Sequence, residues 1–189
     1  MGVNNDFPLH TPEFPSRGIA RESRFDYSDR MLEEGLNKLL ENFTDAAKKH
    51  YGNRLVSIVV YGSVGRGTPR FDSDIDCLII CRDLPQGRTQ RIEDFLILEE
   101  KLSPELKRLQ QQGVSTTFSP ILKTPEEVLK GSPLFLDMIE DAKILYDARQ
   151  FFEKYLVNLK KRLKILGSKR VWKGNAWYWI LKPGEVFEI

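Results

Sequence analysis

Two aspartates, Asp74 and Asp76, stand at the start of an apolar run that continues to Cys81. In a strand, side chains two residues apart point to the same face, so the two carboxylates would lie close together. Like charges at that spacing repel unless a cation lies between them or one is protonated. Because Mg²⁺ takes one or two carboxylates together with substrate phosphates, the pattern predicts Mg²⁺ or Mn²⁺ at Asp74 and Asp76.

A glycine-rich segment precedes this pair, with Gly62, Gly65 and Gly67 separated by Ser63-Val64 and by Arg66. Glycines permit sharp turns and a close approach of the backbone to a ligand. The Ser63 hydroxyl and the planar fork of Arg66 suit phosphate oxygens. A phosphate-binding turn and a metal-binding strand edge, in succession, are typical of a site for a metal-bound nucleoside triphosphate.

Two other phosphate motifs fail on particular residues. Gly62 and Gly67 have P-loop spacing, but Thr68 stands where that motif requires lysine. A dinucleotide fingerprint beginning at Gly65 would need glycine where Arg70 stands. Neither a P-loop nor a dinucleotide-binding turn is therefore expected.

The two segments together, Gly62-Ser63-x-x-Arg66-Gly67 and Ser73-Asp74-Ile75-Asp76, resemble the signature of the DNA polymerase beta-like nucleotidyltransferases, in particular their minimal branch. The resemblance implies transfer of a nucleoside monophosphate from an NTP, with ATP expected, to a hydroxyl acceptor, and release of pyrophosphate. Two metal ions would stabilise the attacking and leaving oxygens. It implies catalytic and metal-binding roles for Asp74 and Asp76, and nucleotide binding by Gly62, Ser63, Arg66, Gly67 and Ser73.

One feature of the family is missing. Its members usually carry a third carboxylate on a neighbouring strand, but the candidate strand, residues 114–123, contains no Asp or Glu. Glu126 and Glu127 follow it and are explained by the first turn of a helix. A catalytically silent nucleotide-binding or regulatory module, antitoxin-like, is therefore an alternative to an active transferase.

The acceptor is left open by the sequence. Acceptors in the family include RNA ends, protein hydroxyls and small hydroxylated molecules, and minimal members often act with a helical partner protein in toxin–antitoxin pairs. A nucleic-acid-binding protein is a further alternative, because residues 154–173 hold eight basic residues and no acidic one. An ordinary solvated helix face explains these charges equally simply.

The elements that must position these residues follow from periodicity. Helical spacing begins at Ser28 or Asp29 and ends at Gly52, and a second helical stretch, residues 89–112, is expected to break at Ser103-Pro104. Apolar runs predict strands at residues 55–61, 75–81, 114–123 and 142–146, and further helices are expected to start at 124–127 and to span 133–140 and 148–166. This order predicts an α/β (α+β) fold, a mixed β-sheet flanked by helices.

Three regions are expected from the same pass. Residues 1–27 contain Pro8, Pro12 and Pro15 and are predicted to form an extended arm. Residues 28–147 form the nucleotidyltransferase domain, with residues 148–189, a basic helix and a Trp-rich tail, packed on it. All three tryptophans lie within 171–179, where packing on the core or a homodimer contact is favoured over base stacking.

The chain has 189 residues and a formal net charge of +2, which favours no particular partner. No signal peptide and no apolar run of roughly 20 residues is present, so no membrane association is expected. The two cysteines, Cys77 and Cys81, fall in one apolar run and are expected to be small buried groups rather than a disulfide or zinc site. A cytoplasmic protein is the prediction.

Overall fold

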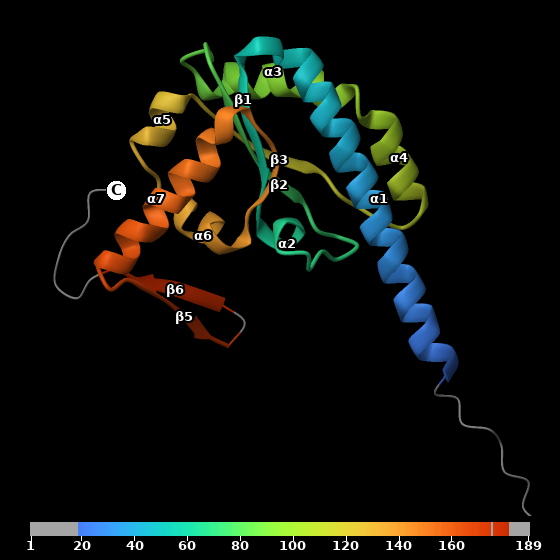
Figure 1. Cartoon of the computed structure of the whole chain (residues 1–189). Helices are drawn as coiled ribbons and strands as arrows, with labels where there is room; N and C mark the ends of the chain where they lie inside the picture. The colour runs from blue at the N-terminus through green and yellow to red at the C-terminus, as the bar shows by residue number, and fades with distance from the viewer. Residues whose placement is uncertain (1–18, 175, 182–189) are drawn as a thin grey trace, which may run out of the picture.

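The computed structural model describes the backbone of residues 19–174 and 176–181, and the side chains of residues 28–174 and 177–181. Its helices and strands (Figure 1) are, in order, α1 (Ile19–Tyr51), β1 (Leu55–Val60), α2 (Gly62–Gly65), β2 (Ile75–Cys81), α3 (Arg88–Glu100), α4 (Ser103–Gln111), β3 (Phe118–Lys123), α5 (Pro125–Leu129), α6 (Leu134–Asp141), β4 (Lys143–Asp147), α7 (Phe151–Ile165), β5 (Lys169–Lys173) and β6 (Ala176–Ile180).

The main sheet has the strand order β3-β2-β1-β4. β1 pairs with β2 and with β4 in antiparallel fashion, whereas β2 and β3 are parallel. The sheet is therefore mixed, and the fold class predicted from the sequence is confirmed. The β2–β3 register places Ser119 opposite Asp76.

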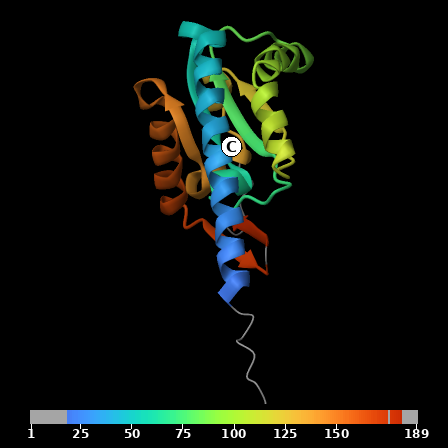
Figure 2. The same ribbon diagram turned by 90° about the vertical axis from the view of Figure 1, so that its right-hand side faces the viewer.

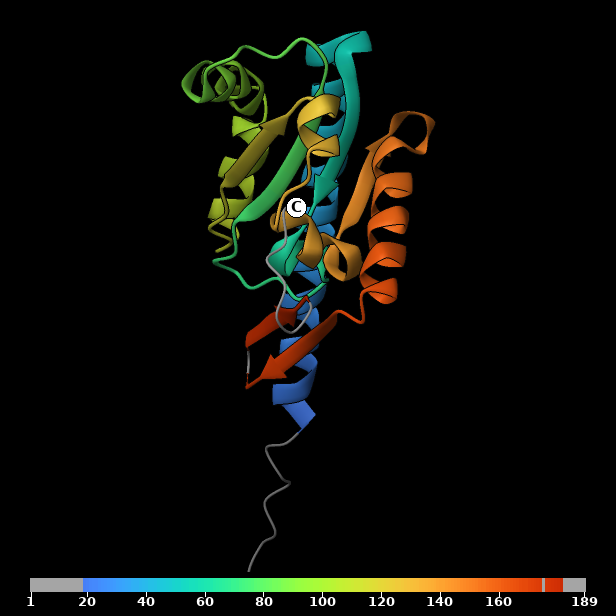
Figure 3. The same ribbon diagram turned by 90° about the vertical axis from the view of Figure 1, so that its left-hand side faces the viewer.

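Helices pack on both faces of the sheet. Successive side chains of β2 point to opposite faces, so they pack against different sets of helices. Cys77, Ile79 and Cys81 pack in one buried cluster with α1, α3 and α4, and α1 crosses this face in Figure 2. Leu78 and Ile80 pack in the other cluster with α6 and α7; in Figure 3 α7 runs alongside β4 and α6 lies near one end of the sheet. Asp76 shares its face with Leu78 and Ile80, so it points toward the α6 side.

The expected extended arm is wrong over its last part. α1 begins at Ile19 rather than at Ser28, so residues 19–27 are helical, while residues 1–18 lie outside the described chain. No proline occurs between Ile19 and Tyr51, and helix propagation is cooperative once a turn has formed. The apolar periodicity marked only the part of this helix that packs on the sheet.

The Trp-rich segment is a second correction, because it forms a two-stranded antiparallel hairpin, β5–β6, that was not predicted. Aromatic and β-branched residues lie on both sides of Lys173-Gly174, and Gly174 has a φ of +62°. That composition is a hairpin signal. In Figure 1 the hairpin lies beyond α6, at the α2 end of the sheet.

Other elements agree with the sequence to within a few residues. The helix of residues 89–112 is broken into α3 and α4, with Ser103 and Pro104 opening α4. The third strand is shorter than predicted, since β3 begins at Phe118 rather than at Val114. Among the helices of the described residues, none has the length and apolar character needed to cross a bilayer.

Candidate nucleotide-binding site

The glycine-rich turn lies directly against the acidic strand. Gly62 has a φ of +67°, and a Cβ at this position would overlap the Asp76 carboxylate, at 3.3 Å from Cγ and closer to Oδ2. The neighbouring Tyr61 N–H donates to the Asp76 carbonyl at 3.0 Å, which holds the end of β1 beside the start of β2. Glycine is needed here both for its backbone conformation and for the missing side chain.

The two predicted carboxylates each face a hydroxyl from β3 or from the residue just before it. Thr117 Oγ1 donates to Asp74 Oδ1 at 2.8 Å, and the Ser119 hydroxyl hydrogen-bonds the Asp76 carboxylate. Asp74 is exposed and precedes the first residue of β2, whereas Asp76 is partly buried within it. The carboxylates of the pair are thus supported by oxygen groups from the neighbouring segment.

The charge of Asp76 is unfavourable in the protein alone. Burial raises the pKa of its carboxyl group above the ordinary 3.8, and the negative charge of Asp74 acts in the same direction. The Ser119 hydrogen bond and the Arg66 charge lower the Asp76 pKa in part. A cation beside the two carboxylates would offset both the burial and the repulsion.

No third carboxylate completes this pair on the neighbouring strand, as the sequence indicated, since β3 reads Phe-Ser-Pro-Ile-Leu-Lys. Within the part of the chain that the structure describes, no group of three or more His, Cys, Asp or Glu side chains could hold a metal ion. Glu127 instead belongs to the capping box of α5 with Thr124. Its carboxylate also accepts two hydrogen bonds from Arg91, at 2.7 and 3.0 Å.

The rest of the glycine-rich segment forms α2 and the turn after it. Gly65 approaches the backbone so closely that a Cβ would lie 2.6 Å from the Asp141 carbonyl oxygen. The Ser63 carbonyl accepts the Thr68 N–H at 2.9 Å, and this bond closes the turn. Ser73 Oγ is engaged, because it accepts the Arg70 N–H at 2.9 Å. Ser73 therefore closes the loop ahead of Asp74 in the structure.

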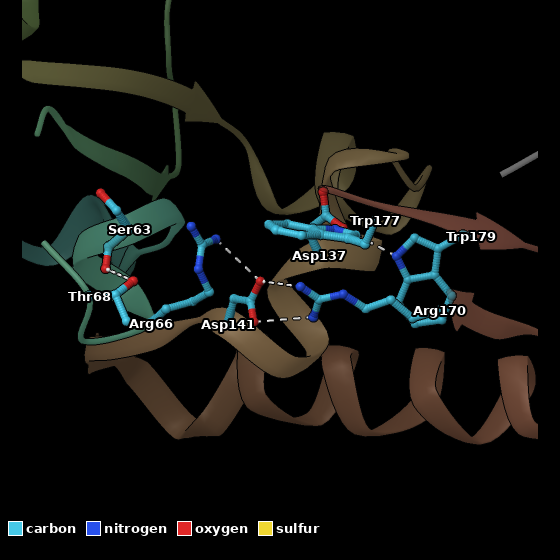
Figure 4. Close-up of polar contacts among 8 residues, drawn as sticks. All are labelled: Ser63, Arg66, Thr68, Asp137, Asp141, Arg170, Trp177 and Trp179. Atoms are coloured by element: carbon cyan, nitrogen blue, oxygen red, sulfur yellow. Dashed lines mark hydrogen bonds and ion pairs between the residues drawn. The ribbon is translucent and has the colours of Figure 1, made fainter. Parts of the chain in front are cut away.

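Arg66 does not pair with Asp72 or Asp74. Its Nη1 lies 3.5 Å from Oδ2 of Asp141, at the end of α6. Arg170, from β5, meets the same carboxylate with two hydrogen bonds of 3.2 and 2.9 Å (Figure 4). The Trp177 ring lies over both guanidinium groups, with its centroid 5.0 Å from Arg66 Cζ and 4.2 Å from Arg170 Cζ.

Arg66, Asp141 and Trp177 line a small cavity of about 180 Å³ that reaches Asp76. The charged groups of its wall and support that sequence reasoning missed are Asp137, Asp141 and Arg170, because they come from α6 and from the unpredicted hairpin. The wall consists of Tyr61, Gly62, Arg66, Asp76, Leu134, Asp137, Asp141 and Trp177. Burial, followed by the Asp76 charge, raises the pKa of Tyr61 to about 12.

A larger hollow, of about 770 Å³, lies at the other end of β1, between α5 and α7, and Leu55, Arg82 and Arg149 are among its lining residues. Neither Asp74 nor Asp76 lines it, so its size does not make it the site of the chemistry predicted above. The two cysteines take no part either, since both are buried free thiols.

Comparison with known proteins decides the family of this chain. The sequence model of the nucleotidyltransferase domain matches residues 40–146, which is more than half of the chain and includes both the glycine-rich turn and the aspartate pair. The chain belongs to the nucleotidyltransferase family. The resemblance noted from Gly62-Ser63 and Asp74-x-Asp76 is thereby confirmed.

A relative in this nucleotidyltransferase family covers more of the chain. It is a protein of Methanocaldococcus jannaschii that carries the provisional name of protein adenylyltransferase MJ1305. It is 33% identical over 150 residues, which are 76% of this chain and 97% of the relative. The domain match and this relative together indicate a transferase.

Solved structures of toxin–antitoxin proteins are also similar, but only distantly. One, determined with AMP-PNP, is 19% identical, spans 71% of this chain and 95% of the other, and has a TM-score of 0.36. A variant of the MntA–HpeT pair is 18% identical over the same shares, with a TM-score of 0.37. These values are too low to transfer anything beyond a general likeness.

Proposed function

We propose that this nucleotidyltransferase moves the adenylyl group of ATP to a hydroxyl group of a protein acceptor, with Mg²⁺ as the metal. The contact that carries the proposal is the one between Gly62 and the Asp76 carboxylate. It puts a turn suited to phosphate and a carboxylate suited to a metal within van der Waals distance of one another. The choice of ATP and of a protein acceptor rests on the name of the M. jannaschii relative.

The residues at this edge of the sheet fit the metal. Asp74 and Asp76 would hold Mg²⁺, which prefers oxygen ligands and often needs only one or two carboxylates beside substrate phosphates. Because Gly62 has no side chain, the Asp76 carboxylate can lie directly against the backbone of the glycine-rich turn. When bound, the ion supplies positive charge to the phosphate oxygens during the displacement.

The chain's own groups would bind and orient the nucleotide. Backbone amides at the start of a helical turn such as α2 have no partner within it, and the Ser63 hydroxyl lies beside them. Arg66 carries a permanent positive charge at the other end of α2. In the transfer, the acceptor oxygen bonds to the α-phosphorus, the bond from that phosphorus to the bridging oxygen breaks, and pyrophosphate leaves. The acceptor hydroxyl loses its proton to water.

Labelled ATP separates this reaction from phosphorylation. The protein, Mg²⁺ and a cell extract are incubated with ATP labelled at either the α- or the γ-phosphate. The proposal expects the labelling that depends on the added protein to come only from the α-position, and to fall by more than about 100-fold in Asp74→Asn and in Asp76→Asn. Asp72→Asn is the matched control, because Asp72 is an exposed neighbour paired with Arg70 at 3.4 Å. Transfer from the γ-position that depends on the added protein and is lost in Asp74→Asn would contradict the proposal.

The class of acceptor is read from the same reaction. A labelled product that protease destroys and ribonuclease spares is expected for a protein acceptor, and the opposite result would assign an RNA. Competition by unlabelled ATP, GTP, CTP or UTP identifies the preferred nucleotide. Only ATP is expected to compete at equimolar concentration.

A silent nucleotide-binding module is the second candidate. The observation in its favour is that β3 offers the hydroxyl of Ser119, and no carboxylate, opposite Asp76. Such a module would bind ATP in a manner that depends on Mg²⁺ and on Asp76, yet transfer no label to any acceptor in the extract.

A further inference from the structure

Asp141 is the point where the C-terminal hairpin meets the nucleotidyltransferase domain. It ends α6, is only 8% exposed, and lies within reach of two guanidinium groups from distant parts of the chain. Arg170 comes from β5, outside the residues that match the family, and Arg66 comes from the glycine-rich turn inside them. Figure 4 shows the three side chains in one row, with Asp141 in the middle.

The two arginines are held unequally. Arg170 makes two hydrogen bonds to the Asp141 carboxylate, at 3.2 and 2.9 Å, and its side chain is 11% exposed. Arg66 makes a single contact of 3.5 Å, at the limit for a hydrogen bond, and its side chain is 29% exposed. The fork-to-carboxylate pairing therefore belongs to Arg170, and most of the donors of Arg66 remain uncommitted.

Trp177 fixes where the two guanidinium groups lie. Its ring faces Arg170 at 4.2 Å and Arg66 at 5.0 Å, within the range of cation–π attraction. Its indole N–H donates to Asp137 Oδ1 at 2.7 Å, which sets the orientation of the ring. Both Arg66 and Trp177 line the cavity that reaches Asp76. The hairpin thus supplies part of the wall beside the predicted metal carboxylates.

We propose that Arg170 is a positioning residue for the nucleotide: it neutralises Asp141 and so leaves Arg66 available to the phosphates of ATP. The C-terminal hairpin is then part of the nucleotide site, although it lies outside the family domain. This inference rests on the proposed function, because it concerns the binding of the same nucleotide.

The physical reason is competition for one buried carboxylate. A buried charge without a partner is costly, so Asp141 would recruit Arg66 fully if Arg170 were removed. Arg66 needs to move little to do so, since it already lies 3.5 Å away. A guanidinium group engaged in that way has fewer donors left for phosphate oxygens. Loss of Arg170 is thus expected to weaken ATP binding through Arg66, without any contact between Arg170 and ATP.

The test is a double-mutant cycle read by calorimetric titration of the full chain with ATP and Mg²⁺. Arg170→Ala is expected to weaken ATP binding by about 10- to 100-fold, the contribution of a charge-assisted hydrogen bond. The second substitution Asp141→Asn, made in the same chain, is expected to restore the affinity to within about threefold of wild type, because Arg66 is then released. Arg66→Ala is expected to bind ATP weakly, whether it is made alone or together with Arg170→Ala or Asp141→Asn.

A matched control lies next to Arg170 on β5. Lys169 is exposed and points to the opposite face of the strand, so Lys169→Ala changes the charge of the hairpin without touching Asp141. Its ATP affinity is expected to equal that of wild type. Circular dichroism of each variant establishes that the fold is retained. If Arg170→Ala does not fold, Asp141→Asn alone carries the test, since it should bind ATP at least as tightly as wild type.

Several outcomes would overturn the inference. It fails if folded Arg170→Ala binds ATP like wild type, if Asp141→Asn does not rescue it, or if Asp141→Asn alone weakens binding. In those cases wild type still binds ATP and the proposed function stands. If the wild-type chain binds no ATP with Mg²⁺, the proposed function fails and the inference fails with it.

Discussion

The Thr117 hydroxyl donates a hydrogen bond of 2.8 Å to the Asp74 carboxylate, and two residues further on Ser119 lies opposite Asp76 in the parallel register of β2 and β3. Residues 117 and 119 are two positions apart, as Asp74 and Asp76 are, so both pairs point to the same face of the sheet. Each carboxylate therefore lies beside one hydroxyl group. Ser119 is accordingly the position from which this strand would supply a third carboxylate.

Ser119→Asp is expected to convert the aspartate pair into a stronger metal site. A third carboxylate adds negative charge beside Asp76, so Mn²⁺ affinity without nucleotide should rise by about 10-fold, measured by calorimetry. The same repulsion should lower the melting temperature without metal, and Mn²⁺ should restore it. Ser115→Asp, at an exposed position before β3, adds equal charge as a control. Equal Mn²⁺ affinity of the two variants would contradict this placement of Ser119.

Gly62→Ala is expected to weaken nucleotide binding. The new methyl group would overlap the Asp76 carboxylate, and alanine is also strained at a φ of +67°. ATP affinity should fall by more than about 10-fold, and stability by about 1–3 kcal/mol. Gly113→Ala separates the two causes, because Gly113 has a φ of +85° but open space around its Cβ. It should lose about 1 kcal/mol of stability and bind ATP normally; equal binding by both variants would refute the role of the close contact.

The Arg91–Glu127 pair predicts a dependence of stability on pH. The hydrogen bonds from Arg91 lower the pKa of Glu127 below its ordinary 4.5 in the folded protein. The pair therefore stabilises the fold fully above pH 4.5, and this contribution is lost as the pH falls through the lower folded pKa. Glu127→Gln should reduce the free energy of unfolding by about 1 kcal/mol at pH 7, allowing for solvent screening, and by progressively less below pH 4.5.

Urea unfolding at several pH values measures this effect. Glu93→Gln serves as the control, because Glu93 is exposed on α3 and its substitution is expected to change stability little at any pH. A stability difference between Glu127→Gln and wild type that stayed constant from pH 7 to below pH 4 would show that the charge of Glu127 is not responsible.

The docking of the hairpin depends on Asp137. Its Oδ1 accepts the indole N–H groups of Trp177 at 2.7 Å and Trp179 at 3.2 Å. Asp137→Ala removes both bonds, so the hairpin should open more often and trypsin should cleave β5 at least about 10-fold faster. Glu140→Ala, an exposed acid on the same helix that pairs with Lys160, is the control. Equal cleavage rates in a mass-spectrometric time course would show that other contacts hold the hairpin.

Local patterns were sufficient for much of the fold. The strands β1 and β2 and the helix break at Ser103-Pro104 each depend on residues that are adjacent in the sequence, and the structure contains all three. The start of α1 was missed because residues 19–27 lack the apolar spacing by which the helix was recognised. The hairpin is not marked by a two-residue alternation, because β6 reads Ala-Trp-Tyr-Trp-Ile and is apolar at every position.

The sequence by itself determined the glycine-rich turn and the aspartate pair, because glycine conformation and the two-residue repeat of a strand are local properties. Tertiary structure alone decided what surrounds them. Asp141 and Arg170 are 29 residues apart and Arg66 is 75 residues from Asp141, so only the packing of α6 and the hairpin beside α2 brings their charges together. No local pattern encodes that packing, since it depends on how separate elements share one buried carboxylate.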